Sequence, residues 1–338
     1  MHIPDNYLSP ATCAVMGAAM VPVWTLAVRK VTREVDRARV PLLGVGAALS
    51  FLIMMFNVPV PGGTTAHAVG GTLLAIVLGP WSACISVSIA LLVQALLFGD
   101  GGILAFGANC FNMGFVIPFL GYFVYRFISQ RVKGQTGEYV GAVAGAYIGI
   151  NMAALAAAIE FGLQPVLARS ATGQPLYCPY PLSVSIPAML ISHLAVAGVV
   201  DAGFTAAIAA FIRRVSPGMI RETPKGKIRW IYAVLVALVC LSPLGLLAAG
   251  TAWGEWGPEE IASVASGGKS LGFVPAGMQG GFKLKALFQD YSVSGLPDIL
   301  GYIISAVAGA AILVILFRIF GLIGRKNSQS ASADTTRS

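Results

Sequence analysis

The stretch EYVGAVAGAYIGINMAALAAAIEFGL, residues 138–163, decides the fold of this chain. It has no charged side chain between Glu138 and Glu160, and about 20 such residues suffice for a helix to cross the ~30 Å apolar core of a bilayer. Gly141, Gly145 and Gly149 recur at every fourth position and form a ridge that lets a second helix approach closely. The stretch therefore predicts a membrane-spanning helix that packs tightly against a neighbour.

The chain as a whole shares this apolar character, since it is 57% hydrophobic and 11% charged with a mean hydropathy of +0.79. Its 40 glycines and 19 prolines, many of them inside apolar runs, suit packed helices better than the alternating strands of a β-barrel. We therefore expect an all-α, polytopic membrane protein. Apolar runs that end at charged residues or at Pro/Gly breaks predict about nine transmembrane helices, near residues 12–28, 40–56, 65–79, 81–98, 103–127, 138–163, 183–212, 230–250 and 298–322.

The chain has a net charge of +8, and most of its 22 basic residues fall in loops on one side of this arrangement. By the positive-inside rule that side is cytoplasmic, so we expect lipid and not nucleic acid around the chain, with the carboxyl terminus inside and the amino terminus outside. This topology needs an odd number of spans and favours counting 65–79 and 81–98 separately, although only Gly79-Pro80 divides them. The basic residues concerned are Arg29, Lys30, Arg33, Arg37, Arg39, Arg126, Arg131, Lys133, Arg213, Arg214, Arg221, Lys225, Lys227, Arg229, Arg318, Arg325, Lys326 and Arg337.

The chain divides into two parts. Residues 1–214 carry seven closely spaced helices, and residues 215–338 form a two-helix hairpin whose outside loop spans residues 251–297. In that loop, Gly268-Lys269-Ser270 resembles the end of a phosphate-binding loop, but Ser263 stands where the first glycine belongs and no strand precedes it. The opening residues, 1–17, lack the basic segment of a secretory signal, so we expect the amino terminus to be retained.

Two of the three histidines, His2 and His67, fall on the predicted outer face. The terminal amine of Met1, the ionised amide of His2 and the His2 imidazole close adjacent five- and six-membered chelate rings, which makes the set planar. Planar nitrogen coordination favours Ni(II) or Cu(II) over tetrahedral Zn(II), and His67 is the best candidate for a fourth donor. Acid should release such a metal, because protons compete for each donor. The alternative is that both histidines are ordinary polar residues near a membrane surface.

Six polar residues could orient these imidazoles as a second shell, or could satisfy one another between helices. They are Asn57, Thr64, Gln94, Asp100, Asn109 and Asn112. Three ionisable residues, His193, Glu160 and Asp201, fall at membrane depth without an obvious ligand partner, so we expect structural roles for them.

Three segments carry a resemblance to a known family. They are MHIPDNYLSP (residues 1–10), PGGTTAH (residues 61–67) and GANCFNMG (residues 107–114). With them, residues 1–214 resemble the CbiM/NikM family, the substrate-binding S components of energy-coupling-factor importers for cobalt and nickel. Residues 228–322, with DYSVSGL at 290–296, look like the small NikN-type accessory subunit of these importers, fused to the first part.

The resemblance implies a seven-helix S component in a prokaryotic cell membrane, with its metal held at the outer surface by Met1, His2 and His67. It also implies that the chain is not an enzyme, since an energy-coupling transmembrane subunit and two cytoplasmic ATPases would drive transport. The chain departs from the family pattern at Asn6, where members commonly have glycine, which puts the turn of the terminal loop in doubt.

The NikN-like part and the planar donor set favour Ni(II) as the transported substrate, with Co(II) as the alternative. A function of another class, a membrane-embedded metalloenzyme, would need a catalytic acid or base beside the metal, and the sequence has no HExxH motif. A self-sufficient channel or secondary transporter would show paired charges or inverted repeats at mid-membrane, and the sequence shows neither convincingly.

Overall fold

A computed structural model of the chain describes residues 1–36, 39–60, 64–215, 229–248, 250–258, 260–263, 265–266, 269–282 and 284–335. Residues 61–63 of the PGGTTAH segment, Gly268 and several of the predicted cytoplasmic basic residues lie outside the described residues. These basic residues are Arg37, Arg221, Lys225, Lys227 and Arg337.

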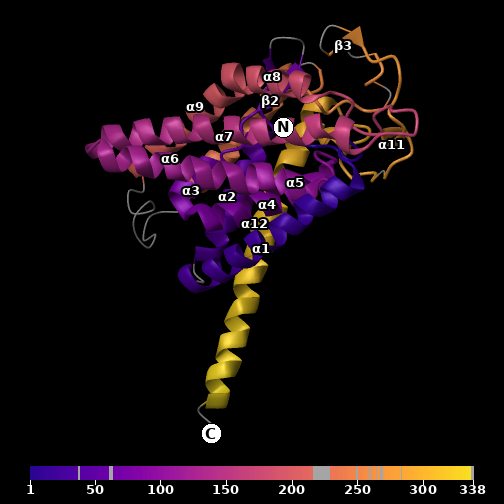
Figure 1. Ribbon diagram of the computed structural model, residues 1–338. Coiled ribbons are helices and arrows are strands. Elements are labelled where there is room, and N and C mark those ends of the chain that lie inside the picture. The colour runs from indigo at the N-terminus through magenta and orange to yellow at the C-terminus, as the bar shows by residue number, and fades with distance from the viewer. Residues whose placement is uncertain are drawn as a thin grey trace.

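Helices account for most of the described chain (Figure 1). Three of them continue through a turn of π-helix. Seven helical stretches within the described ranges are long and apolar enough to cross a membrane, which confirms the predicted all-α, multi-pass fold. The helices are α1 (Pro10–Glu34), α2 (Val40–Met54), α3 (Gly71–Leu78), α4 (Pro80–Val93, continued by η2, Gln94–Phe98), α5 (Phe106–Asn109, continued by η3, Cys110–Val116), α6 (Ile117–Arg131), α7 (Gly134–Leu167), α8 (Leu182–Ser192, continued by η4, His193–Ala197), α9 (Gly198–Val215), α10 (Arg229–Leu241, continued by the 3-10 turn η6, Ser242–Leu247), α11 (Ala276–Gln279) and α12 (Asp298–Thr335). The 3-10 turn η7 (Gln289–Tyr291) and the short strands β3 (Ala265–Ser266) and β4 (Lys269–Ser270) lie between α10 and α12.

The predicted helix over residues 65–79 is wrong in its first part. Strand β1 (Asn57–Val60) pairs with β2 (Thr64–His67) in an antiparallel hairpin, and helix α3 begins only at Gly71. Gly70 precedes it at φ +72°, a backbone conformation that does not continue a helix. At 1.5 Å per residue, the eight residues of α3 reach about 12 Å and cannot span a bilayer alone.

The segment 64–78 nevertheless returns along α2, as the topology requires. The Ser50 hydroxyl donates to the Val69 carbonyl at 2.7 Å, and further along α2 the Leu74 and Leu78 side chains lie against Gly46. The return is thus a strand, a turn and a short helix. Apolarity predicted that this segment is buried, but the β-branched Thr64-Thr65 pair and Gly70 decide its backbone.

The glycine ridge of α7 packs against α6, which lies beside it in Figure 1. A Cβ added at Gly145 would lie 2.4 Å from the Gly121 carbonyl oxygen, and one at Gly141 would lie 2.9 Å from the Tyr125 carbonyl oxygen. Only glycine allows so close a contact between the two backbones.

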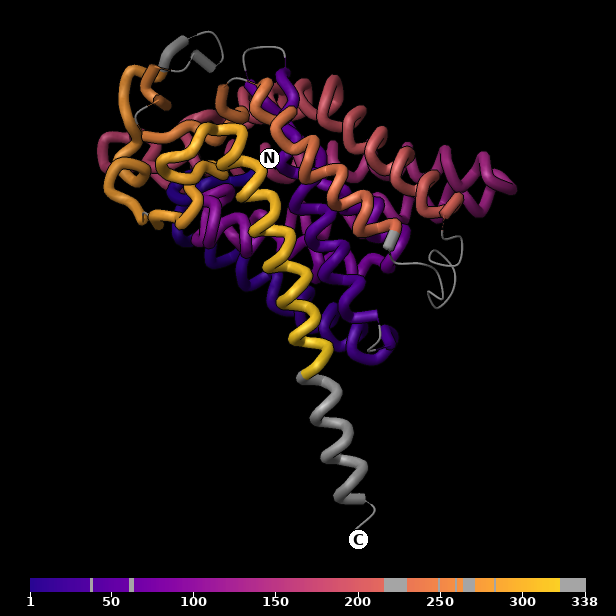
Figure 2. The backbone as a smooth tube through the Cα atoms, turned by 180° about the vertical axis from the view of Figure 1, so that it is seen from behind, coloured from indigo at the N-terminus to yellow at the C-terminus, as the bar shows by residue number. Residues whose placement is uncertain are grey.

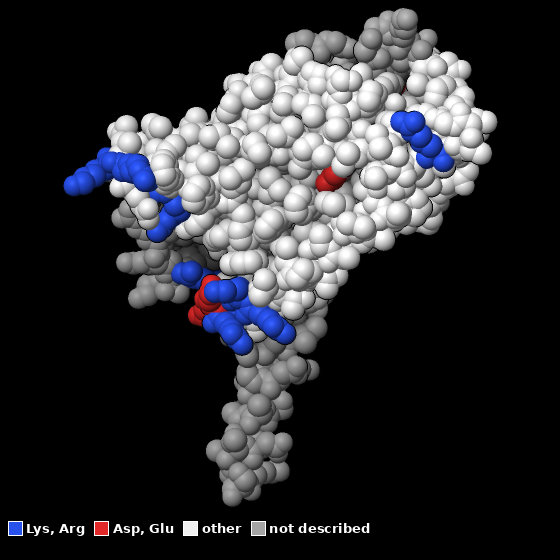
Figure 3. All heavy atoms as spheres, viewed as in Figure 1, with Lys and Arg blue, Asp and Glu red and all other residues white. Residues whose placement is uncertain are grey.

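Basic residues collect at one end of the helix bundle. Helices α1, α6 and α9 end in Arg33, Arg131 and the pair Arg213 and Arg214. Figure 3 shows Lys and Arg gathered at the ends of these helices, with a broad, almost uncharged surface between them and one small basic patch at the far end. By the positive-inside rule the basic end faces the cytoplasm.

The C-terminal helices pack on α2 (Figure 2). A Cβ at Gly309 of α12 would lie 2.2 Å from the Phe51 ring, and one at Gly44 would lie 2.7 Å from the Phe317 Cβ. Between α10 and α12 the chain covers the outer end of the bundle, where Trp253 and Trp256 pack against Tyr180. Glu255 and Phe282 of this covering segment contact Met1 and Asn6 near the amino terminus.

Candidate metal centre

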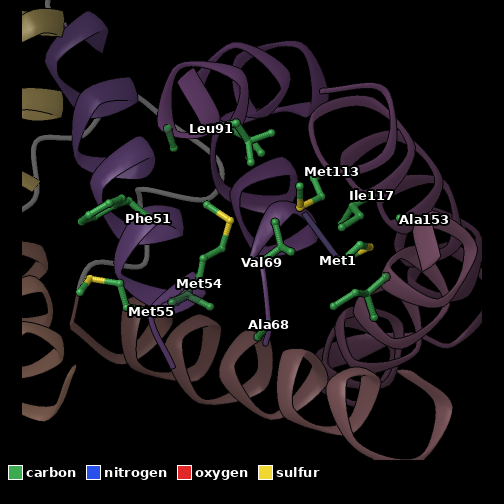
Figure 4. Packing of buried hydrophobic residues seen from close by; sticks show 14 of the residues in the cluster. Met1, Phe51, Met54, Met55, Ala68, Val69, Leu91, Met113, Ile117 and Ala153 are labelled. Carbon is green, nitrogen blue, oxygen red and sulfur yellow. The ribbon is translucent and has the colours of Figure 1, made fainter. Parts of the chain in front are cut away.

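The first residues of the chain are buried inside the bundle and do not trail from it. Met1 is 3% exposed and His2 2% exposed, and Figure 4 shows Met1 within the ring of helices, in the same apolar cluster as Met113 and Ile117. Apolar burial of Met1 and Ile3 therefore fixes the terminal amine in one place.

The side chain of Asn109 holds this N-terminal segment by its backbone. The Asn109 Oδ1 accepts from the Ile3 N–H at 2.8 Å, and the Asn109 Nδ2 donates to the Ile3 carbonyl at 3.0 Å. The Gly102 N–H donates to the same carbonyl at 2.8 Å, and a Cβ at Gly102 would lie 2.4 Å from the Asp5 nitrogen. A glycine is required at this contact because a larger residue would push the terminal loop away.

Asn6 takes a left-handed backbone conformation with φ +68°. Asparagine tolerates this region better than most residues, and glycine adopts it freely, so either residue can make this turn. The Asn6 Nδ2 also donates to the Phe282 carbonyl at 2.7 Å. The departure at Asn6 therefore leaves the turn of the terminal loop intact.

His67 is placed by the β-hairpin and by a helix that is distant in sequence. It pairs with Asn57 in the strand register. Two residues further on, Val69 and Gly70 donate their N–H groups to the Asp201 Oδ1 of α9 at 2.9 and 2.7 Å. Asp201 thus ties the turn that follows His67 to a membrane-spanning helix.

The His67 ring presents a free nitrogen to the site. Its Nδ1 lies 3.0 Å from the Ala68 carbonyl oxygen, which can only accept, so Nδ1 carries the hydrogen and Nε2 the lone pair. The ring is 4% exposed, and its Nε2 has no partner among the described residues. Burial, with the nearby Met1 amine and His2, holds the pKa of His67 well below its usual range, so the ring is neutral at pH 7.

The His2 ring stacks on that of His67, with the ring centroids 4.8 Å apart and an interplanar angle of 24°. The His2 Nδ1 lies 2.8 Å from the Asp100 Oδ1, and the His2 Nε2 is buried without a partner among the described residues. Asp100 also accepts from the Tyr291 hydroxyl at 2.5 Å and from the Gln94 Nε2 at 3.2 Å. Burial alone would raise the pKa of Asp100, but the charge and hydrogen bond of His2 outweigh it and lower the pKa.

The Met1 amine lies 2.8 Å from the Glu255 Oε1, which comes from the segment between α10 and α12. Glu255, Asp100 and both imidazoles line one cavity of about 350 Å³. The planar chelate predicted from the sequence would use the His2 Nδ1 and the Met1 amine, and these two atoms contact Asp100 and Glu255 in the structure. Side chains alone do not form the site, since no group of three or more His, Cys, Asp or Glu in the described part of the chain could hold a metal.

Four of the six polar residues that were predicted to orient the imidazoles lie at the site, and two lie away from it. Gln94 and Asp100 contact each other beside His2, Asn109 acts through Ile3, and Asn57 lines the cavity. Thr64 lies at the other end of the hairpin, opposite Val60, and the Asn112 Nδ2 donates to the Glu160 Oε2 at 2.9 Å.

Sequence reasoning did not assign Glu255 or Tyr291 to the site. Tyr291 stands in the quoted DYSVSGL segment, which carried a resemblance but no stated role. Glu255 stands between the two tryptophans of the outer loop and had no motif to mark it. His193, by contrast, bonds within its own helix, because its Nδ1 lies 2.8 Å from the Met189 carbonyl oxygen.

This fold and this cavity define a multi-pass membrane protein with two stacked, buried imidazoles in one cavity at the end of its helix bundle. The profile of the CbiM family, described as the cobalt uptake substrate-specific transmembrane region, matches residues 2–219. A second profile, the PDGLE domain, matches residues 227–326. The chain belongs to the CbiM family, with a PDGLE domain fused behind the matching region, so the resemblance seen in the sequence is confirmed.

Similar proteins come from bacteria and archaea. The chain is 54% identical over 322 residues to the probable fused nickel transport protein LarMN of Lactiplantibacillus plantarum, covering 94% of this chain and 97% of that protein. It is 47% identical over 330 residues to the fused nickel transport protein NikMN of Rhodobacter capsulatus, covering 93% and 95%. A crystal structure of a truncated transition metal transporter superposes with a TM-score of 0.60 at 57% identity, covering 63% of this chain and 99% of that one.

Proposed function

We propose that this chain captures Ni(II) for an ATP-driven importer of the energy-coupling-factor type. Membership of the CbiM family makes it a component of nickel or cobalt transport. The observation that carries the proposal is the buried His67 Nε2, which has no partner among the described residues, on a ring that stacks against His2 in the cavity that Glu255 also lines. Glu255 in turn contacts the Met1 amine. Buried polar atoms without partners are rare, and the lone pair on the neutral His67 ring suits a divalent transition metal.

In this proposal four nitrogens hold the cation. They are the Met1 amine, the His2 amide, the His2 Nδ1 and the His67 Nε2. The first three come from one piece of chain and close two chelate rings, so planar Ni(II) is favoured. Co(II) is the alternative, since imidazole also suits cobalt and relatives such as that of Geobacter sulfurreducens are named cobalt transport protein CbiM.

The two parts of the chain then have different roles. Residues 1–214 hold the metal, and residues 215–338 act as the accessory part that covers the site. Transport energy comes from partners, namely an energy-coupling transmembrane subunit and two cytoplasmic ATPases. The relatives are named as transport proteins, and no catalytic acid or base is needed for capture.

The test is nickel binding to the purified full chain in detergent, after mass spectrometry has verified that Met1 is its first residue. One Ni(II) per chain is expected, and His67→Ala should abolish tight binding. An Ala added ahead of Met1 should do the same, because it moves His2 out of chelate register while both histidines stay. The matched control is one Ala inserted after Gly173, in an exposed loop. Unchanged nickel affinity in the N-terminally extended protein would show that the donors are misassigned.

A further inference from the structure

Two cavities meet at Glu255 on the outer end of the molecule. The first, of about 350 Å³, is lined by His2 and His67 and is called the metal cavity below. The second, of about 310 Å³, lies between the terminal loop and the segment carrying Met278 and Phe282. Both are lined by Glu255, together with Pro4, Gly99 and Gly101. Glu255 therefore stands at the junction between the metal cavity and the second cavity, which is lined by Trp256, Met278 and Phe282 of the covering segment and is called the outer cavity below.

Glu255 reaches the proposed donor set from the other half of the chain. Its Oε1 lies 2.8 Å from the Met1 nitrogen, 254 residues away in sequence. The Met1 side chain is fully buried, whereas the Glu255 side chain is 20% exposed. One carboxylate thus touches a buried donor atom and is still accessible to water.

The neighbouring carboxylate at the site cannot serve in the same way. Asp100 is engaged by His2, Tyr291 and Gln94 within the metal cavity, and the outer cavity is not lined by it. Glu255 is the carboxylate that borders both cavities and also contacts a proposed metal ligand.

A hydrated divalent cation faces two obstacles at this site. Its donors are almost fully buried, so it must lose its water before it can bind, and the desolvation of an unpaired charge is costly. The Met1 ammonium also repels it. A carboxylate oxygen beside that ammonium lowers both barriers, because it balances the charge and replaces water molecules in the cation's shell.

Building on the nickel-capture function proposed above, we propose that Glu255 is a transient ligand that passes the cation from the outer cavity to the Met1 amine. The step is a ligand exchange at constant oxidation state. The bond between the carboxylate oxygen and the cation breaks as the amine nitrogen, having lost its proton to water, forms its own bond to the cation. The accessory part would thereby supply a loading group to a site held by the first part.

A loading group has a kinetic signature. A transient ligand lowers the barrier in both directions, so its loss slows association and dissociation together and leaves their ratio nearly unchanged. We expect Glu255→Gln, which keeps the shape and removes the charge, to slow nickel association by about tenfold or more. Dissociation should slow by a similar factor, so that Kd stays within about threefold. Glu255→Asp should restore part of the rate.

The experiment uses the full chain in detergent with nickel chloride as the probe. Stopped-flow absorbance gives the association rate, a chelator chase gives the dissociation rate, and equilibrium dialysis gives Kd. The control is Glu260→Gln, which removes the same charge from an exposed side chain of the same segment that lines neither cavity. Wild-type rates in that control exclude a general charge effect.

Each other outcome overturns the idea. Unchanged rates in Glu255→Gln mean that Glu255 takes no part in loading, and faster association means that it blocks the site. Weaker equilibrium binding with an altered absorption spectrum means that it is a permanent ligand. If Glu255→Gln does not fold, wild-type rates in Glu255→Asp equally refute the transfer role. A wild-type chain that binds no nickel refutes the proposed function itself, which separates the two failures.

Discussion

Replacing Asp201 with Ala should weaken nickel binding although Asp201 touches none of the proposed donors. Its Oδ1 accepts the N–H groups of Val69 and Gly70, at 2.9 and 2.7 Å, and these residues lie two and three positions after His67, in the turn that leads to α3. Without the carboxyl group, both N–H groups lose their partner in a buried region. His67 then sits on a turn that is no longer tied to α9.

The magnitude follows from the number of backbone groups released. Two buried N–H groups without partners cost about 1–3 kcal/mol each in stability, or about 2–6 kcal/mol together. If the turn relaxes to avoid this cost, metal binding must order two residues again, at about 1–2 kcal/mol each. A penalty of about 2–4 kcal/mol in binding corresponds to a thirtyfold to several-hundredfold weaker affinity.

The assay is equilibrium nickel titration of purified variants, with thermal unfolding measured in parallel. Asp201→Asn retains a carbonyl oxygen that can accept at least one N–H and should lie between wild type and Asp201→Ala. Thr205→Val is the control, since it lies one turn further along α9 and its hydroxyl has no partner among the described residues. A folded Asp201→Ala protein with wild-type nickel affinity would refute the claim that α9 positions His67.

Three further predictions rest on other contacts. Nickel binding should release about two protons, from the Met1 ammonium and the His2 amide, so affinity should rise with pH and the heat of binding should vary with the buffer's ionisation enthalpy. Gly102→Ala should displace the terminal loop and weaken nickel affinity by about tenfold in the same titration, whereas a smaller effect would mean that the loop adapts. Gly145→Val should overpack the contact between α6 and α7 by about 1–3 kcal/mol and lower the thermal unfolding midpoint, while Gly203→Val, with no atom near its added Cβ, should not.

The membrane-spanning elements could be predicted closely because length and apolarity are local properties. The stretch at 138–163 lies within α7, and the run at 298–322 lies within α12. The run at 65–79 was the exception, since apolarity marks burial and does not distinguish a helix from a buried strand and turn.

Of the candidate site, the sequence could name only the proposed donors. His2 could be proposed because a terminal amine next to a histidine is a chelating unit within a single piece of chain. His67 could be proposed because charge asymmetry placed it on the same face. Glu255 and Tyr291 could not, because their place at the site depends on how the segment between α10 and α12 folds back over the N-terminal loop.

The sequence by itself determined the membrane class and the position of most spans, and it supplied the predicted cytoplasmic end and the proposed nitrogen donors. These follow from hydropathy, charge position and the chemistry of single residues, which do not depend on distant parts of the chain. Only the tertiary structure decided that the N-terminus is buried, that Asp201 holds the turn after His67, and that carboxylates face the amine and the His2 ring. Those contacts join residues more than 90 positions apart, and packing of whole helices fixes such distances.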